Sequence, residues 1–383
     1  MRLAVVSSHP IQYYAPLCRE LAGRIDLHVF FAHRATPQQQ ADAGFGTAFD
    51  WDVDLTAGYE HSFLRNIAAR PGTDHFGGCD TPEISARLKD GGFDALLVFG
   101  WGLKSFAQAI WAAKRLGLPV LVRGDSQLVT QRSALKRAGK ALLYPALLRA
   151  FDAALYVGAR SKAYYQHYRF PAERLFFSPH CVDNAWFAER ATSHARRRLR
   201  TRLGIGEAEK VVLFAGKLQP FKRPLDVIEA CARLSTQGLA AHLVVAGSGE
   251  LAGAMEARAA ALGVSLHMLG FQNQTQMPDA YAAADVLMLP SNGSETWGLV
   301  CNEALACGRP ILVSDQVGCA EDLAADGRAG QVFPMGDIES AAMALRRLLA
   351  EPPTASAIAA RSAEYSLAAA ADGVITALQS VAA

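Results

Sequence analysis

The chain has 383 residues, of which 51% are hydrophobic and 32 are glycine, and its formal net charge is +2. This composition argues against a disordered chain, and the length exceeds the roughly 250–300 residues that one hydrophobic core usually serves. The near-neutral charge argues against a dedicated nucleic-acid-binding protein, and no apolar run approaches the roughly 20 residues of a membrane span. The seven cysteines form no CxxC pair, which is typical of reduced thiols in a cytoplasmic protein.

The first half of the sequence alternates short apolar runs with helical patterns. The runs LAVVSS, LHVFFA, ALLVFG, PVLVRG and AALYVG predict buried parallel strands. The patterns Gln12–Ala22, Leu103–Leu116 and Leu135–Ala150 predict helices. Since the N-terminal run is a strand pattern, we do not expect it to be a signal peptide. Repeated strand–helix units indicate right-handed crossovers and a doubly wound sheet.

Two basic segments have alternative interpretations. The first mixes leucines at helical spacing with Arg132, Lys136, Arg137, Lys140 and Arg149. It is either a surface helix with a basic face or a helix that rests on an anionic membrane. The second is the run RRRLRTR, which we expect to be a solvated helix face, with contact to lipid or acceptor as the alternative. We therefore expect a cytoplasmic protein and leave open a peripheral contact with the inner face of the cell membrane.

A second series of alternating strand and helix patterns begins after residue 182. Proline, an Asp-Asn turn signal and the arginine-rich run separate it from the first. Its predicted strands are VVLFAG, HLVVAGSG, VSLHMLG, ADVLMLPS, RPILVS and GQVF. We predict an α/β fold with two Rossmann-like domains, 1–182 and 183–362, which face each other across a cleft. A final helix over 363–383 is expected to pack back on the first domain. Ligands of such sheets bind at the carboxyl ends of the strands.

The loop after VVLFAG carries two cations, Lys217 and Lys222. Two lysines close to a helix start suit an anionic ligand, and simple solvation is the alternative. A dinucleotide-dependent oxidoreductase is disfavoured, because the first strand is followed by SSHPIQYY and the second domain has only the weak glycine pair of AGSGE.

The loop SNGSET carries Glu295, and the predicted helix Gly298–Ala306 carries Glu303. The amides of Gly298 and Leu299 at the helix start would be unpaired, and Gly298 permits close approach of an oxygen-rich ligand. Ionised carboxylates only accept hydrogen bonds, which suits the hydroxyls of a sugar. We interpret the segment as a site for a phosphate-bearing polyol, with the acids on its hydroxyls and the lysines and amides on its phosphates.

These motifs together resemble a known family. E-x7-E within PSNGSETWGLVCNEALACGRPILVSD resembles the signature of retaining GT-B glycosyltransferases of family 4, or glycosyl transferases group 1. FAGKLQPFKRPLDVIEA is similar to that family's G-R-L-x-x-x-K-G loop. VVAGSGE, LGFQNQTQMPDAYAAADVLMLPS and SPHCVDNAWF match its remaining landmarks in order. The resemblance covers nearly all of the second domain, whereas the first domain matches mainly in its plan.

The resemblance implies a nucleotide-sugar donor and assigns roles to the charged residues. Glu303 would bind the ribose hydroxyls, and Glu295 would contact hydroxyls of the transferred sugar. Lys217 and Lys222 would neutralise the departing diphosphate, so that neither a metal nor a cofactor is expected. The family usually has Arg where Lys217 stands and Gly where Arg223 stands. A lysine keeps the charge but loses the bidentate fork of an arginine. The other implied binding residues are Gly216 in the lysine loop, the amides of Gly298 and Leu299, and Phe271 with Gly270 beside the base.

The first domain departs from the family's pattern. The family usually places a histidine after the fourth or fifth strand, but LVRGDSQL offers Arg123, Asp125 and Ser126 there. We expect Asp125 to face the donor sugar or the acceptor hydroxyl, with Arg123 beside it as a substrate-binding residue. His9, in the loop after the first strand, is a second candidate. A turn or helix-cap role is the alternative. Core packing is the expected use of Trp51, Trp101 and Trp111, with stacking on an acceptor sugar as the alternative.

The expected function is a retaining glycosyltransferase of the polysaccharide-biosynthesis type. It would move a sugar from a nucleotide-diphosphate sugar to a glycan, lipid-linked or small-molecule hydroxyl. A nucleotide-sugar epimerase on the same fold is the nearest enzymatic alternative, and E-x7-E argues against it. A non-catalytic nucleotide-sugar-binding subunit stays open because the family's histidine is missing.

Overall fold

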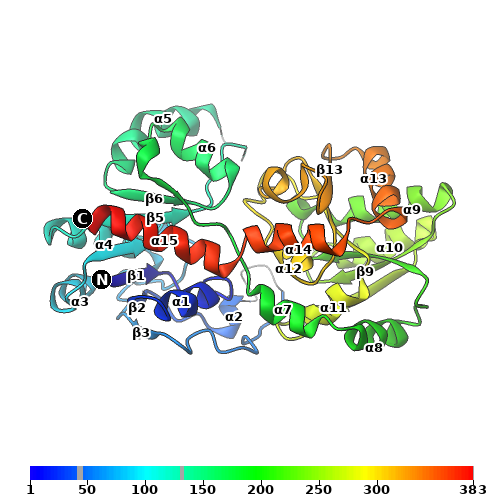
Figure 1. The fold of residues 1–383 in the computed structure, drawn as a ribbon, viewed down its shortest axis with the longest axis horizontal. Coiled ribbons are helices and arrows are strands. Elements are labelled where there is room, and N and C mark those ends of the chain that lie inside the picture. Colours follow the sequence, from blue (N-terminus) through cyan, green and yellow to red (C-terminus); the bar gives the residue numbers. More distant parts are fainter. Residues whose placement is uncertain (41–45, 130–132, 383) are drawn as a thin grey trace.

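The computed structural model describes residues 1–40, 46–129 and 133–382. Figure 1 shows two α/β domains that lie next to each other, with the C-terminal helices running along both. All strand pairs in the described residues are parallel. This arrangement agrees with the predicted pair of doubly wound sheets.

The first domain is built on a seven-stranded sheet of order β3-β2-β1-β4-β5-β6-β7. Its strands are β1 (Arg2–Ser7), β2 (Asp26–Phe31), β3 (Glu60–Phe63), β4 (Ala95–Val98), β5 (Val120–Gly124), β6 (Ala153–Tyr156) and β7 (Leu175–Phe177). Its helices are α1 (Tyr14–Ala22), α2 (Pro37–Gln40), η2 (Phe76–Gly78), α3 (Ile84–Asp90), α4 (Lys104–Arg115), α5 (Ala134–Leu148), α6 (Ala159–His167) and η3 (Ala172–Arg174). The sequence did not predict β3 and β7, since β3 is an edge strand with a polar pattern and β7 has three residues.

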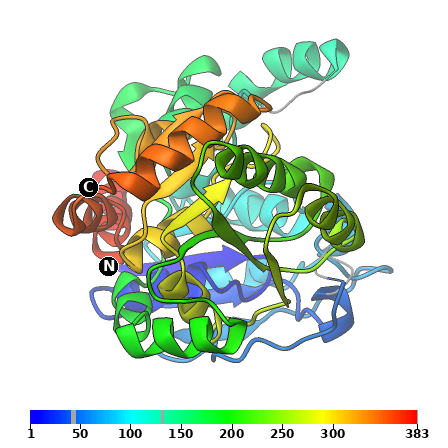
Figure 2. The same cartoon turned by 90° about the vertical axis from the view of Figure 1, so that its right-hand side faces the viewer.

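The second domain has a six-stranded sheet of order β10-β9-β8-β11-β12-β13. Figure 2, in which this domain faces the viewer, shows helices on both sides of the sheet. The strands are β8 (Lys210–Ala215), β9 (Ala241–Ala246), β10 (Leu266–Gly270), β11 (Val286–Leu289), β12 (Ile311–Ser314) and β13 (Gly330–Phe333). The helices are α7 (Asn184–Arg190), α8 (Ser193–Leu203), η4 (Pro220–Lys222), α9 (Pro224–Thr236), α10 (Ala252–Leu262), α11 (Met277–Ala283), α12 (Val300–Ala306), η5 (Ala320–Ala324), α13 (Ile338–Ala350), α14 (Ala355–Glu364) and α15 (Leu367–Ala382).

The strand order places a topological switch point in each sheet. In the second sheet, β8 and β11 are neighbours and the order runs outward from them in opposite directions. The loops that leave two such strands turn to opposite faces of the sheet and leave a crevice between them, where ligands of open α/β sheets bind. Here those loops are 216–223 and 290–299, which contain Lys217, Lys222 and Glu295.

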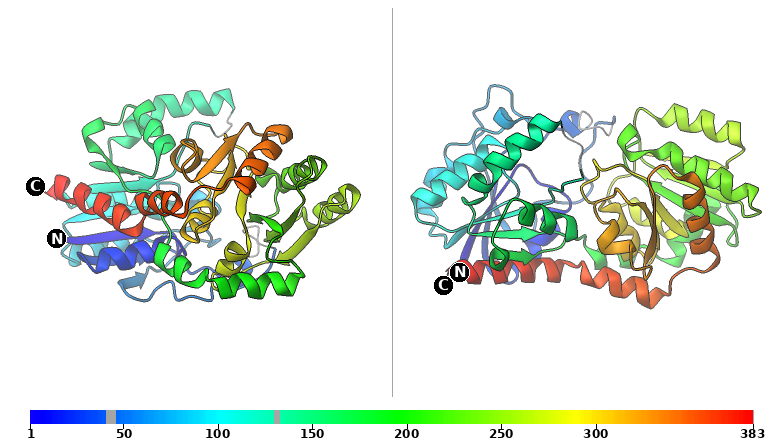
Figure 3. Two further views of the ribbon diagram at one scale, coloured as in Figure 1. Left: turned by 45° about the vertical axis from the view of Figure 1, so that its right-hand side comes forward. Right: turned by 90° about the horizontal axis from the view of Figure 1, so that it is seen from above.

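The chain crosses between the domains twice. It passes from β7 to α7 through residues 178–183, and it returns from α14 to α15 at residues 365 and 366. Figure 3 shows α14 along the second domain and α15 along the first. Val374 and Leu378 of α15 belong to the same buried cluster as Leu3 and Val5 of β1. The last helix is therefore part of the core of the first domain.

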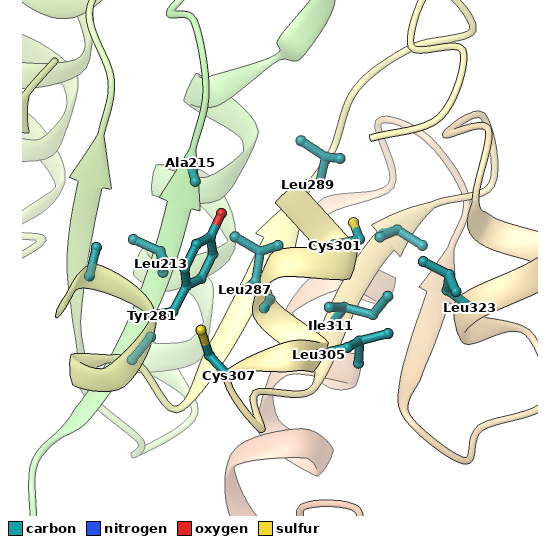
Figure 4. Close-up of a cluster of buried hydrophobic side chains, with 14 of the residues drawn as sticks. Leu213, Ala215, Tyr281, Leu287, Leu289, Cys301, Leu305, Cys307, Ile311 and Leu323 are labelled. Carbon is teal, nitrogen blue, oxygen red and sulfur yellow. The ribbon is translucent and has the colours of Figure 1, made fainter. Parts of the chain in front are cut away.

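One buried cluster of the second domain lies between its sheet and the helices α7, α11, α12 and α14, and another lies on the opposite face with α9, α10 and α13. Figure 4 shows the ring of Tyr281 between Leu213 and Leu287, with its hydroxyl toward Ala215, the last residue of β8. A buried tyrosine usually needs a partner for its hydroxyl. This hydroxyl therefore brings a polar group from the core to the carboxyl end of the sheet.

The arginine-rich run forms α8, which has exposed arginines and two arginines that bind inside the protein. Arg196 and Arg200 both bind the carboxylate of Asp285, with N–O distances of 2.9 and 3.0 Å. Arg198 binds Asp279 of α11. These ion pairs and further bonds to the carbonyls of residues 282–284 fasten α8 to α11. The expectation of an exposed basic face was therefore wrong for Arg196 and Arg200, whereas Arg198 is 58% exposed.

None of the described helices combines the length and the apolar character needed to cross a membrane. All seven cysteines are buried and unpaired.

Candidate active site

A cavity of about 600 Å³ lies between the two domains. The second domain contributes the loops after β8, β9, β10 and β11 and the start of α12. The first domain contributes residues 11–14, Trp51, Asp125 and His180. The cavity therefore lies where the carboxyl ends of the two sheets meet. The residues that line it include nine that the sequence analysis predicted for the site: Lys217, Lys222, Glu295, Glu303, Gly216, Gly298, Leu299, Phe271 and Asp125.

The lysine loop is held close to the loop after β9 by direct backbone contact. A Cβ on Gly247 would lie 1.9 Å from the carbonyl oxygen of Gly216, so only glycine fits there. The amide of Leu218 donates to the carbonyl of Ser248 at 2.9 Å. The glycine pair of AGSGE thus lets the two loops pack closely, which fixes the position of Lys217.

Lys222 and Glu295 form an ion pair within the cavity. Both side chains are only 13% exposed, and the Oγ of Ser291 donates to the same carboxylate at 3.1 Å. The loops that carry the pair are joined by a bond of 2.8 Å from the amide of Asn292 to the carbonyl of Phe221. Burial lowers the pKa of Lys217, and the nearby positive charge of Lys222 lowers it further. The cavity therefore concentrates two amines, and one of them is paired with an acid.

Glu303 is buried on α12 with tyrosines from both domains around it. The hydroxyl of Tyr281 donates to Oε2 of Glu303 at 2.5 Å. Tyr13 of the first domain hydrogen-bonds to the same carboxyl group. Burial raises the pKa of Glu303 to about 7, although both hydrogen bonds act in the opposite direction. Glu303 therefore changes its protonation state near neutral pH, on the wall of the cavity.

The turn before α12 differs slightly from the prediction. The helix begins at Val300 and not at Gly298, and it has seven residues. Gly298 has a φ of +96°, and a Cβ there would lie 2.7 Å from Leu289. Both the left-handed backbone and the close contact require glycine. Gly298 and Leu299 face the cavity as predicted, but they belong to the turn that precedes the helix.

Asp125 is the charged residue that the first domain presents to the cavity. Its side chain is 44% exposed, and Oδ2 accepts a bond of 2.6 Å from the Oγ1 of Thr296 in the second domain. Burial alone raises the pKa of Asp125, but the interactions with His180 and Thr296 outweigh it and hold this pKa below its ordinary value. Asp125 is therefore ionised at neutral pH.

His180 is a site residue that sequence reasoning missed. It lies in the first crossing segment, and its Nε2 is 3.8 Å from Oδ2 of Asp125. Its ring packs against Trp297 with centroids 5.4 Å apart, and its carbonyl accepts from Asn302 at 3.0 Å. Burial lowers the pKa of His180 despite the nearby carboxylate. The motif SPHCVDNAWF contained this histidine, but only the fold places it beside Asp125.

Two first-domain candidates are not among the residues that line the cavity. Arg123 is 2% exposed, and its guanidinium donates to Ser178 Oγ at 3.1 Å and to the carbonyl of Pro179 at 2.6 Å. The expectation that Arg123 binds substrate was therefore wrong, because its charge is used inside the protein. His9 has its Nδ1 3.0 Å from the Oγ of Ser8. Burial, followed by the charge of His33, lowers the pKa of His9 to about 4.

Aromatic side chains from both domains meet at one end of the cavity. Trp51 and Phe271 line it, whereas Gly270 does not. The ring of Trp101 packs against that of Phe151, with ring centroids 5.9 Å apart, and the side chain of Trp111 is 58% exposed. Of the three tryptophans considered in the sequence, Trp51 is the one that lines the cavity.

The second domain is similar to a known family of proteins. Residues 195–365 match the family model described as "Glycosyl transferases group 1". This match lies within the second domain and marks its similarity to glycosyl transferases group 1. A D-inositol 3-phosphate glycosyltransferase of Geodermatophilus obscurus is 35% identical over 208 residues, which are 51% of this chain and 45% of the relative. A GDP-mannose-dependent alpha-(1-6)-phosphatidylinositol monomannoside mannosyltransferase of Mycolicibacterium smegmatis is 29% identical over 252 residues, or 64% of this chain and 63% of the relative. The chain spans less than half the length of three D-inositol 3-phosphate glycosyltransferases that it matches.

Solved structures extend the likeness to the whole chain. The crystal structure of Anabaena Alr3699/HepE in complex with UDP has a TM-score of 0.76 at 16% identity and covers 99% of this chain and 100% of that chain. A sucrose-phosphate synthase from Thermosynechococcus elongatus has a TM-score of 0.69 at 19% identity, and the likeness covers 99% of this chain and 98% of that chain. These likenesses and the two parallel sheets confirm the predicted GT-B fold.

The raised pKa of Glu303 predicts a pH-dependent stability. Its pKa in the folded protein, about 7, exceeds the ordinary value of 4.5, so folding favours the protonated acid. The stabilising contribution is complete below pH 4.5 and is lost as the pH rises through 7. Glu303→Gln removes this loss, so the variant should gain up to about 3 kcal/mol relative to the wild type between pH 5 and pH 8. Urea unfolding of both proteins at the two pH values measures the difference, and an equal difference at both would contradict the shift.

Proposed function

We propose that this protein is a retaining glycosyltransferase that moves a sugar from a nucleoside-diphosphate sugar to an acceptor hydroxyl. The observation that carries the proposal is the convergence of Lys217, Lys222, Glu295 and Glu303 on one interdomain cavity. Two amines suit a diphosphate, and two acids suit the hydroxyls of a ribose and a hexose. The match of residues 195–365 to glycosyl transferases group 1 supports the same assignment.

The comparisons support the class of donor and do not single out its base. The structural relative from Anabaena is described in complex with UDP and with UDP-glucose, and the mannosyltransferase relative is named as GDP-mannose-dependent. A pyrophosphate attached to a nucleoside is common to both. We therefore assign the ribose to Glu303, the diphosphate to Lys217 and Lys222 with the amides of Gly298 and Leu299, and the transferred sugar to Glu295.

The ion pair of Lys222 and Glu295 has a role in this assignment. Without a ligand, Glu295 supplies the negative charge that a buried ammonium needs. A bound diphosphate would supply this charge in its place, which frees Glu295 to accept hydrogen bonds from the donor sugar. The binding of the phosphates thus releases Glu295 from Lys222, so that its carboxylate can bind the sugar.

The proposed reaction is a front-face displacement that retains the anomeric configuration. The bond from the anomeric carbon to the diphosphate oxygen breaks, and a bond from the same carbon to the acceptor oxygen forms on the same face. The acceptor's proton passes to the leaving diphosphate oxygen, so no separate protein base is required. Lys217 and Lys222 stabilise the charge that develops on the leaving group, which is the part a metal would otherwise play.

Asp125 is the proposed contribution of the first domain to this chemistry. It faces the cavity across from the donor loops and is ionised, with Thr296 and His180 beside it. An ionised carboxylate there would orient a hydroxyl of the donor sugar or of the acceptor. The acceptor is a glycan, lipid-linked or small-molecule hydroxyl in this proposal.

Donor binding and turnover test the proposal directly. One or more of UDP-, GDP-, ADP- and TDP-sugars should raise the melting temperature of the wild-type protein, because a ligand that binds only the folded state stabilises it. Lys217→Met and Lys222→Met should each weaken that ligand about tenfold or more, since each removes a charge-assisted bond to phosphate. Lys89→Met, at an exposed position on α3, is the matched control. Slow hydrolysis of the donor, undiminished by EDTA, should accompany binding.

Three results would overturn this assignment. The first is the absence of any shift with all four donors, and the second is equal binding by both lysine variants. The third is release of an altered nucleotide sugar without cleavage, which would favour an epimerase.

Kinetics of Asp125→Asn test its role. The substitution keeps the size of the side chain and removes its charge. We expect kcat to fall at least tenfold, with a melting temperature within a few degrees of the wild type, because the cavity-facing carboxylate acts on the reacting sugars. The measurement is the rate of donor hydrolysis with saturating donor. An unchanged rate would remove Asp125 from the mechanism.

A peripheral membrane contact through α5 is also proposed. Leu142 and Leu143 of this helix are 79% and 63% exposed, and Leu135 is 83% exposed. Exposed leucines next to basic residues are typical of helices that rest on anionic lipid. Lys140 contacts the hydroxyl of Tyr164 at 3.2 Å. Arg132, at the start of the basic segment, lies outside the described residues.

Flotation with liposomes tests the membrane contact. The wild-type protein should float with vesicles that contain phosphatidylserine and less with vesicles of phosphatidylcholine alone. Leu142→Ser combined with Leu143→Ser should reduce flotation severalfold. Met343→Ser, at a position on α13 that is 53% exposed, should not. Flotation that does not depend on anionic lipid or on these leucines would overturn the contact.

A further inference from the structure

A short segment of the first domain reaches across the mouth of the cavity to the second domain. We name it the strap, residues 49–52, between α2 and β3. It meets the loop between β10 and α11 at three points. The rings of Phe49 and Phe271 are 4.3 Å apart. The side-chain amide of Asn273 donates to the carbonyl of Asp50 at 2.8 Å. Thr275 donates from its amide, at 3.2 Å, and from its hydroxyl to the carboxylate of Asp52.

These contacts leave the remaining strap residue, Trp51, facing the cavity. Its ring lies edge-on to Phe49, with centroids 5.0 Å apart, and Phe49 is only 9% exposed. Trp51 lines the cavity together with Phe271 and Met277. An indole, a phenyl ring and a thioether form an apolar surface that suits a flat aromatic ligand. The strap thus carries an aromatic side chain to a wall that otherwise belongs to the second domain.

The position of Glu303 indicates which part of a ligand lies at this end. Glu303 is bonded to Tyr281, which is four residues after Met277 on α11. Met277 is therefore one helical turn, about 5–6 Å, nearer to the loop that the strap contacts. The lysines approach the cavity from a different loop, after β8. A nucleoside with its ribose on Glu303 and its phosphates on the lysines would direct its base toward Met277, Phe271 and Trp51.

We infer that the strap makes the first domain part of the base subsite, with Trp51 stacking against the base of the nucleotide. The inference rests on the proposed function for the ribose and diphosphate positions. It adds that base recognition is shared between the domains, since the strap contacts Phe271 and its neighbours only when the domains are apposed. Nucleotides that place a base in this subsite therefore stabilise the apposed arrangement, and ligands without a base do not.

Binding of UDP and GDP, compared with binding of inorganic pyrophosphate, tests the inference by titration calorimetry on the full chain. Pyrophosphate has the charges that the lysines would bind but has no base. Trp51→Ala should weaken whichever of UDP and GDP the wild type binds about fivefold or more, because stacking on a base contributes roughly 1–3 kcal/mol. It should leave the affinity for pyrophosphate within a factor of two. Trp111→Ala, at an exposed position on α4, is the matched control and should change neither affinity.

A second variant acts on the strap without altering the wall of the cavity. Thr275→Val keeps the shape of the side chain but removes the hydroxyl that binds Asp52. It should weaken the nucleotide in the same direction by a smaller factor, again without affecting pyrophosphate. An unchanged nucleotide affinity in Trp51→Ala would overturn the strap's role and leave the proposed function intact. An equal loss for pyrophosphate would show a general disturbance of the site and would also overturn it. Failure of the wild type to bind UDP, GDP, pyrophosphate and also ADP and TDP would overturn both proposals.

Discussion

The buried guanidinium of Arg123 connects the two segments that cross between the domains. It donates to Ser178 and to the carbonyl of Pro179 in the first crossing, and the hydroxyl of Ser178 donates at 2.9 Å to the carbonyl of Ala370 in α15. A buried charge without acceptors is costly, so these bonds are difficult to give up. The segment that leaves the first domain and the helix that returns to it are thereby tied to β5. This arrangement holds both connections between the domains against the first sheet, beside the cavity that His180 of the first crossing lines.

The parts of the site that sequence could predict are the local ones. A strand followed by a loop with two lysines, or by SNGSET and an apolar helix, is visible in a short stretch of residues. The strand order then brings the loops after β8 and β11 together at a switch point. This is why Lys217, Lys222, Glu295 and Glu303 were all placed on the cavity from sequence. The fold could be predicted for the same reason, because buried parallel strands form continuous apolar runs.

The parts that sequence could not predict depend on contacts between the domains. His180 and Asp125 are 55 residues apart, and Asp125 and Thr296 are 171 apart. No local pattern links such positions, so the histidine beside Asp125 was overlooked. Arg123 illustrates the opposite error. It was read as part of a functional loop, but it is still within β5, where its side chain points into the protein and the loop begins only after Gly124.

The pairing of Lys222 with Glu295 makes the unliganded cavity locally balanced in charge at that point. A neutral saccharide would find the acid already engaged, and removing the acid from its ammonium without a replacement anion would be unfavourable. Only a molecule that brings its own negative charge can exchange places with Glu295. On the proposed function, the site would therefore discriminate against free sugars, because they carry no charge that could replace Glu295 beside Lys222.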